Sequence, residues 1–207
     1  MKKLWCLLAL TPMLPFSAFA QDVPVVDLFL GYSFVRANSA RDIPAFTANG
    51  GLGTFGYNFN NHIGLEAEIG GYHNGNIHDI MFDTTFMPYL FGPRLSWGRS
   101  KGFDPYVHFL FGATHLTTSV PVTLTVNPAP PNSTPTTTRL KAAQDNFTMA
   151  IGGGIDLKMN KVMTLRPIQL DYFMTRFEDF GQLGPSENRN QHNIRYAAGV
   201  MFTFGAR

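Results

Sequence analysis

The chain has 207 residues and a formal net charge of +2, from 16 lysines and arginines against 14 aspartates and glutamates. This length suits one domain, and no basic stretch points to a nucleic-acid partner. The composition is unusual, because 19 Phe, 7 Tyr and 20 Gly accompany few charges. Aromatic and glycine enrichment without long apolar runs argues against a helical membrane protein and favours many short strands.

The first twenty residues have the pattern of a secretory signal peptide. Two lysines at residues 2–3 give a positive start, and an apolar stretch follows at residues 4–16. Ala18 and Ala20 provide the small residues of a cleavage site, so the mature chain is expected to begin at Gln21. The alternative is a membrane anchor, but the apolar stretch is short for a bilayer span and contains two prolines. Without the two lysines, positive and negative side chains are equal in number.

Cys6 is the only cysteine, and it lies inside the expected signal peptide. A lipoprotein carries its cysteine at the end of the apolar region, so Cys6 is a poor lipidation site. The mature domain, residues 21–207, therefore has no disulfide and no thiolate metal site. No cofactor is expected, and the spacing of His73 and His78 in an expected loop is weak evidence for a metal.

Beyond Gln21, eight segments alternate apolar and polar residues with a period of two, which is the pattern of β-strands. Each is long enough to cross a bilayer as a tilted strand, which needs roughly 9–11 residues. The expected strands are Val26–Arg36, Phe46–Phe59, His62–Tyr72, Thr84–Trp97, Phe103–Leu116, Asn146–Lys158, Met163–Arg176 and Asn193–Phe204. Because hydrocarbon cannot satisfy an open sheet edge, the last strand should pair with the first. The predicted fold is all-β: a transmembrane antiparallel up-and-down β-barrel of eight strands.

The connections between these segments alternate in length. The short ones are residues 60–61, 98–102 and 160–161, and the long ones are residues 37–45, 73–83, 117–145 and 177–192. Outer-membrane barrels have short periplasmic turns and long extracellular loops. The longest connection, Thr117–Asp145, is rich in proline and threonine and is expected to be a flexible loop, in which residues 122–126 could lengthen a strand.

The two faces of the expected strands indicate a membrane barrel. One face carries large apolar side chains, and the other carries glycines and a few charges of both signs, too few to solvate an exterior. The polar face should therefore line a narrow lumen in which glycines make room. The expected lumen network contains Glu66, Glu68, Arg94, Tyr106, His108, Asp156, Asp171 and Arg195.

Several segments resemble the OmpA-type eight-stranded outer-membrane barrels, in the form of a stand-alone β-barrel domain. These segments are Tyr57–Asn60 followed by Ile63–Glu66, then Tyr89–Arg94, Pro105–Val107, Ala150–Asp156, Arg166–Tyr172 and the last strand, Tyr196–Phe204. The resemblance implies a place in the outer membrane, contact with its lipid and lipopolysaccharide, and recognition of the last strand by the assembly machinery. Family members often end on an aromatic residue, whereas Gly205–Arg207 follow Phe204 here.

Aromatic residues at the strand ends are expected to form two interfacial girdles. Phe59, Trp97 and Phe204 are assigned to the periplasmic side, and Phe34 and Tyr72 to the external side.

Enzyme chemistry has two weak candidates. Glu66 and Glu68 share a face, as paired carboxylates do in glycosidases, but lumen charges bonded to Arg94 and Arg195 explain them better. His115 and Thr117 share the outward face, where a lipid A hydrolase would need a histidine and a hydroxyl nucleophile.

The favoured function is a non-enzymatic structural or surface-interaction role, with any extracellular ligand bound on the loops. The lipid A hydrolase is the first alternative. A small-solute pore is the second, although eight strands leave no aqueous bore.

Overall fold

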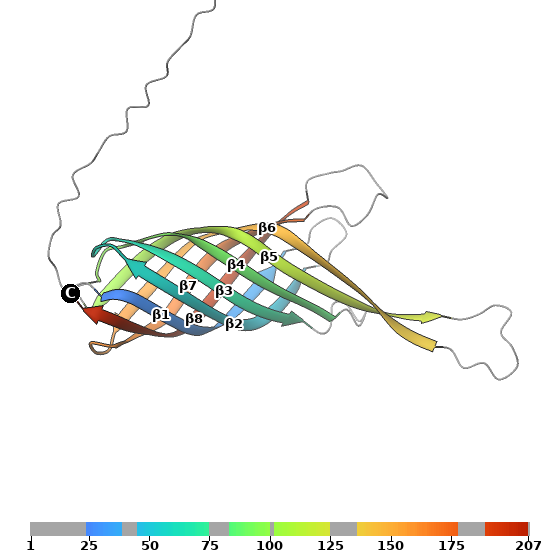
Figure 1. The fold of residues 1–207 in the computed structure, drawn as a ribbon, viewed down its shortest axis with the longest axis horizontal. Helices are drawn as coiled ribbons and strands as arrows, with labels where there is room; N and C mark the ends of the chain where they lie inside the picture. The colour runs from blue at the N-terminus through green and yellow to red at the C-terminus, as the bar shows by residue number, and fades with distance from the viewer. Residues whose placement is uncertain are drawn as a thin grey trace, which may run out of the picture.

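The structure is a computed structural model that describes residues 24–38, 45–74, 83–99, 102–124, 136–177 and 189–206. These residues form eight antiparallel strands closed into a barrel (Figure 1). The strands are β1 (Pro24–Ala37), β2 (Phe46–Asn58), β3 (Ile63–Asn74), β4 (Asp83–Ser96), β5 (Phe103–Leu124), β6 (Thr136–Lys158), β7 (Met163–Phe177) and β8 (Arg189–Ala206). The predicted fold class is confirmed. The expected signal peptide and His78 lie outside the described residues.

Every strand pairs with its neighbour in sequence, and β8 closes the ring by pairing with β1. This closing register runs from Pro24 opposite Ala206 to Ala37 opposite Asn193. Closure leaves the sheet without an open edge, as a barrel surrounded by hydrocarbon would require.

The two ends of the barrel differ. At one end, here called the turn end, three short connections join β2 to β3, β4 to β5 and β6 to β7. The other end, the loop end, carries the four longer connections. Two of the turns are built alike: Oδ1 of Asn60 accepts from the backbone N–H of Ile63 at 2.8 Å, and Oδ1 of Asn160 accepts from that of Met163 at 2.7 Å. Asparagine stabilises such turns because its side chain imitates a backbone acceptor.

β5 and β6 are much longer than expected. Their register continues without a break to Leu124 opposite Thr136, well beyond the loop end of the other strands (Figure 1). Residues 117–124 and 136–145 are therefore strand. A flexible loop was expected there, with a lengthened strand only at residues 122–126. Valine and threonine are frequent in these stretches, and β-branched residues favour extended backbone.

The outward face of the barrel is apolar. Leu30 and Phe91 are each more than half exposed, and Ile69 and Ile151 have comparable exposure. No helix among the described residues is long and apolar enough to cross a membrane. Small apolar clusters lie inside the barrel instead, for example Phe29 with Leu52, Ala197 and Met201.

A β-bulge interrupts the pairing of β7 with β8 between Arg166 and Gln169. Pro167 lies within it and cannot donate a ladder hydrogen bond, and prolines in sheets concentrate at such irregularities. The extra residue changes which positions face inward, so Arg166 and Gln169 both point into the lumen although they are three residues apart.

Candidate functional site: the barrel lumen and its loop end

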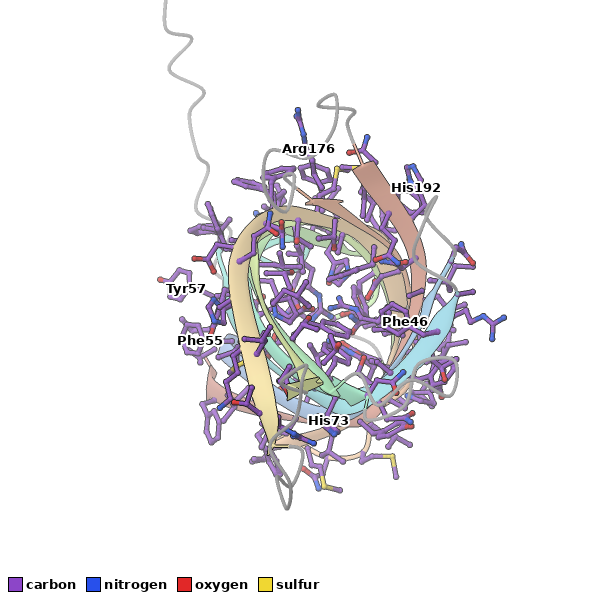
Figure 2. All side chains as sticks on the ribbon, turned by 90° about the vertical axis from the view of Figure 1, so that its right-hand side faces the viewer. Phe46, Phe55, Tyr57, His73, Arg176 and His192 are labelled. Carbon is purple, nitrogen blue, oxygen red and sulfur yellow. The ribbon has the colours of Figure 1, made fainter. Side chains whose placement is uncertain are left out.

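The eight polar residues expected in the lumen all lie buried inside the barrel. Figure 2 looks into the barrel from the loop end and shows side chains filling the interior. The buried residues of the expected network are Glu66, Glu68, Arg94, Tyr106, His108, Asp156, Asp171 and Arg195.

Arg195 on β8 organises the part of the network nearer the loop end. Its Nη2 lies 2.8 Å from Oε2 of Glu68, across the lumen on β3, and 2.7 Å from Oδ2 of Asp171 on the neighbouring strand. His108 joins the same group, because its ring nitrogens lie 2.8 Å from Oδ1 of Asp171 and 3.1 Å from Oε2 of Glu66. These five side chains come from four strands and tie the barrel together across its axis.

Arg166 on β7 and Arg94 on β4 share Asp156 in the part nearer the turn end. Arg166 donates from Nε to Oδ1 at 2.8 Å and from Nη2 to Oδ2 at 3.1 Å, and Arg94 donates from Nη2 to Oδ2 at 2.6 Å. Both guanidinium groups also lie over the ring of Tyr106, with Cζ 4.5 Å and 4.0 Å from its centroid. These cation–π contacts stabilise positive charge in a place where water is excluded.

Gln169 connects the two parts. Its Oε1 accepts from Arg166 and from the Tyr106 hydroxyl, both at 2.9 Å, and its Nε2 donates to Asp171 at 2.9 Å. An amide fits this position because it is both a donor and an acceptor.

The network continues to the turn end through Ser96. Ser96 Oγ accepts from Arg94 at 3.3 Å and from Arg99 at 3.1 Å, and Arg99 donates to Asp27 at 2.6 Å. Hydrogen bonds therefore run from Asp27 at the turn end to Glu68 deep in the barrel. Buried side chains therefore occupy the lumen between these two points.

The expected network omitted six of these members: Asp27, Ser96, Arg99, Asp104, Arg166 and Gln169. Asp27 and Gln169 lie at the alternate positions of their strands whose side chains point into the barrel (the inward parity), so alternation could have identified them. Asp104 is the second residue of β5 and lies 3.7 Å from Arg94, and Arg99 lies in a turn. Arg166 lies next to the proline that marks the bulge, where simple alternation fails.

The pairing also differs from expectation. Arg195 binds Glu68, but Arg94 binds Asp156 instead of a glutamate. Glu66 is instead held by His108, with Arg166 Nη1 at 3.8 Å. Which opposite charges meet depends on their height along the axis, which parity does not give.

Glycines on β6 make room for the network. A Cβ on Gly152 would lie 2.1 Å from Oδ1 of Asp171, and one on Gly154 would lie 2.4 Å from the carbonyl oxygen of Ile168 and 2.9 Å from the hydroxyl of Tyr106. The lumen side chains thus lie directly on a stretch of bare backbone.

The expected girdle assignment of Tyr72 is wrong. Tyr72 is buried inside the barrel, stacks on Phe86 with centroids 4.7 Å apart, and donates from its hydroxyl to Ser33 at 2.9 Å. It has the inward parity of Glu66 and Glu68, and its ring reinforces the interior.

The other four expected girdle aromatics lie on the outer surface. Phe59, Trp97 and Phe204 are at least half exposed near the turn end. Phe34 is half-buried toward the loop end.

A cavity opens inside the loop end. Its apolar wall consists of Val35, Ala37, Phe46, Phe86, Leu116 and Phe173. Thr114, Thr175, Gln191 and Asn193 complete the lining. Phe46 is seen on the inner side of the ring in Figure 2, whereas His192 and Arg176 project outward.

Two histidines on the outer surface near the loop end contact polar side chains of neighbouring strands. Nδ1 of His115 lies 2.7 Å from Oδ1 of Asp145, and Nδ1 of His73 lies 3.3 Å from Oγ1 of Thr85. No group of three or more histidine, cysteine, aspartate or glutamate side chains suited to a metal is found among the described residues.

The comparisons with known proteins agree with this architecture. The outer membrane protein beta-barrel domain matches residues 6–205. The chain belongs to this family. It is therefore an outer-membrane β-barrel protein, and the apolar belt around it faces lipid.

Solved barrels from Gram-negative bacteria have the same fold. Neisserial surface protein A is 12% identical with a TM-score of 0.56, over 89% of this chain and 100% of that protein. The attachment invasion locus protein of Yersinia pestis is 14% identical with a TM-score of 0.52, over 86% and 97%. OprG of Pseudomonas aeruginosa is 13% identical with a TM-score of 0.51, over 87% and 96%. No curated protein sequence matches the chain.

Proposed function

We propose that this protein is a non-enzymatic outer-membrane barrel that acts at the cell surface through the projecting part of β5 and β6. That part, here called the ribbon, comprises Val120–Leu124 and Thr136–Asp145. The observation that carries the proposal is its length: β4 pairs with β5 only to Ser119, and β7 pairs with β6 only from Phe147. Beyond those points the described strands pair only with each other.

The ribbon has the properties of a binding element. Thr138, Arg139 and Lys141 are exposed, and Leu140 has 61% of its surface exposed. Both edges of a two-stranded ribbon present backbone N–H and C=O groups, to which an extended segment of another protein can add as a strand. Placement of such an element on a rigid barrel is typical of recognition surfaces.

The remaining features fit this role. The loop end faces the exterior, because long loops are extracellular in such barrels. The filled lumen speaks against a pore. Two proteins with the same fold are named for a surface location and for attachment and invasion, respectively. Outer-membrane lipid and lipopolysaccharide surround the belt, and the assembly machinery recognises β8.

The test is a shortened protein in which residues 120–140 are replaced by an Asn-Gly turn, which favours a tight hairpin. Cells that display the full-length or the shortened barrel are compared for attachment to immobilised extracellular-matrix proteins. We expect the full-length protein to increase attachment and the shortened one to lose the increase. A heat-dependent shift in gel migration verifies that both barrels are folded. Equal attachment by the two folded proteins would exclude the ribbon as the binding element.

Lipid A hydrolysis is the second candidate, and the hydrogen bond between His115 and Asp145 is the observation that favours it. A base oriented by a carboxylate is part of hydrolytic triads, and Thr117 lies two residues away on the same outward face of β5. The mass spectrum of lipid A decides between the two functions. We expect the same spectrum with and without the protein; loss of an acyl chain that depends on His115 would establish the enzyme.

A further inference from the structure

We propose that the outer wall of the barrel meets anionic, phosphate-bearing lipid headgroups along a ring of four hydrogen-bonded polar pairs near the loop end, here called the polar ring. The pairs are Tyr32 with Asn49, His73 with Thr85, His115 with Asp145, and Tyr172 with His192. This inference concerns the wall at the base of the ribbon and does not depend on what the ribbon binds.

The four pairs follow one another around the barrel. Each pair joins the two strands of one long-loop hairpin, so that β1 is linked to β2, β3 to β4, β5 to β6 and β7 to β8. Neighbouring pairs also adjoin. Asn49 lies directly opposite His73, and the backbone carbonyl of His192 accepts from Nδ2 of Asn38 on β1 at 2.8 Å. Because all eight side chains lie on the outer face, the pairs form one polar level near the loop end of the wall.

Between the polar ring and the turn end, the outward positions of the described strands hold only apolar or aromatic residues and glycines. On β6, for example, Phe147 and Ile151 are exposed, and on β8 Ile194 has 56% of its surface exposed. Hydrocarbon favours such a surface, whereas polar side chains within it must be hydrogen-bonded. The polar ring is therefore the first level above the turn end at which the outer wall offers hydrogen-bonding groups from every hairpin.

The height of this apolar wall matches a bilayer. About 12 residues separate His115 from Phe103 on β5, and the same number separate His192 from Phe204 on β8. At a rise of about 3.3 Å per residue and a strand tilt of 35–45°, this length spans roughly 30 Å along the barrel axis. The apolar band of outer-membrane barrels is about 25 Å tall, with interfacial residues on both sides. The polar ring thus lies where the headgroups of one leaflet begin.

Two arginines give the polar ring its charge. Arg36 lies directly opposite Ile194, and Arg176 lies directly opposite Asn190, so that both flank His192 on β8. Both arginines are exposed, and Arg176 and His192 project away from the barrel in Figure 2. Cations at this level attract anionic lipid.

Carboxylates do not oppose this attraction. Among the side chains that the structure describes, the only exposed carboxylate is that of Asp145, and it is bonded to His115. The others are buried in the lumen. The charge at the ring therefore suits an anionic headgroup better than a cationic one.

Spin labels on single cysteines test the level of the ring. Residues 21–207, which contain no cysteine, are refolded in bilayers of phosphatidylcholine and phosphatidylglycerol. Phe147→Cys and Ala143→Cys flank Asp145 on β6, and Ile194→Cys and Asn190→Cys flank His192 on β8. We expect the labels at 147 and 194 to collide mainly with oxygen, which partitions into hydrocarbon, and those at 143 and 190 mainly with a water-soluble nickel chelate. The same environment for both labels of either strand would overturn the assignment of the boundary.

The association of spin-labelled phosphatidylglycerol, relative to phosphatidylcholine, tests the charge. Arg36→Gln combined with Arg176→Gln should lower this selectivity severalfold, and the corresponding lysine substitutions should retain it. Arg139→Gln combined with Lys141→Gln is the matched control, because it removes the same charge from the ribbon, farther from the bilayer. It should leave the selectivity unchanged. A heat-dependent shift in gel migration verifies folding. Unchanged selectivity in the first variant, or an equal loss in the control, would show that the polar ring does not bind anionic headgroups.

Discussion

Arg166 has more partners than any other cation of the lumen. Its guanidinium contacts Asp156 twice and Gln169 once, and it lies over the rings of Phe29 and Tyr106. Removal of one partner from a buried ionic group leaves the others charged and uncompensated, which costs about 3–5 kcal/mol. The number of contacts that each arginine makes should therefore order the effects of substitution.

Arg166→Met should lower the free energy of unfolding by about 3–5 kcal/mol. Arg94→Met should lower the free energy of unfolding by less, because Asp156 keeps both hydrogen bonds from Arg166. Urea titrations of the barrel in lipid vesicles measure both values. Arg36→Met is the control, since Arg36 is exposed and surface substitutions usually change stability by less than about 0.5 kcal/mol. Equal losses at positions 36 and 166 would contradict a network held by buried ion pairs.

Gly154→Ala should destabilise the barrel by about 1–3 kcal/mol, the usual cost of overpacking. The added methyl would lie 2.4 Å from a backbone carbonyl oxygen, which cannot move without disturbing the ladder between β6 and β7. Gly51→Ala is the matched control, because a Cβ at Gly51 has nothing within 4 Å. The same urea titration compares them, and a stable Gly154→Ala barrel would show that β7 can shift to admit a methyl group.

At the scale of the strands, alternation and connection length predict most of the architecture. The starts of β2, β5 and β7 and the end of β6 agree with the expected residues. The other strand boundaries differ from the expected ones by only a few positions, except at the loop ends of β5, β6 and β8. The ribbon was anticipated only as a lengthening of one strand at residues 122–126, because prolines and threonines suggest a loop, whereas in the structure each strand of the pair stabilises the other. Tyr72 was wrongly assigned to the outer girdle because it is an aromatic residue at a strand end, although its position alternates inward with Glu66 and Glu68.

The lumen is predicted less completely than the strands. Parity identifies the inward residues of a regular strand, but a bulge changes the parity from one side to the other, as at Pro167. Pairing across the lumen depends on strand stagger, which sets the height of each residue along the axis. The sequence carries no local signal for that height.

Single cysteines should reveal which end of the barrel is outside. Residues 21–207 contain no cysteine, so each introduced thiol is the only one in that part of the chain. Thr138→Cys on the ribbon should react with a membrane-impermeant maleimide on intact cells, because long connections are extracellular. Asn160→Cys at the turn end should react only after the outer membrane is permeabilised. Reaction of Asn160→Cys alone on intact cells would invert the orientation.

For the whole molecule, a filled lumen predicts little steady ion current. The arginines and carboxylates inside this eight-stranded barrel bind one another and therefore do not line a water-filled channel. Refolded protein in a planar bilayer should give at most brief, small openings, from ion pairs that exchange partners. A stable, large conductance would mean that this network does not close the barrel in lipid, and transport would then become the leading function.

The distribution of the network over the chain has a consequence for assembly. Asp27 lies on the first strand and Arg195 on the last, and Arg195 is 127 residues from its partner Glu68. A sheet that lacks β8 would carry the carboxylates of Glu68 and Asp171 without this cation. Unpaired carboxylates are costly in hydrocarbon, so an incomplete sheet resists entry into the bilayer. Addition of the last strand thus neutralises these carboxylates and closes the sheet in one step, so only the complete chain is stable in the lipid.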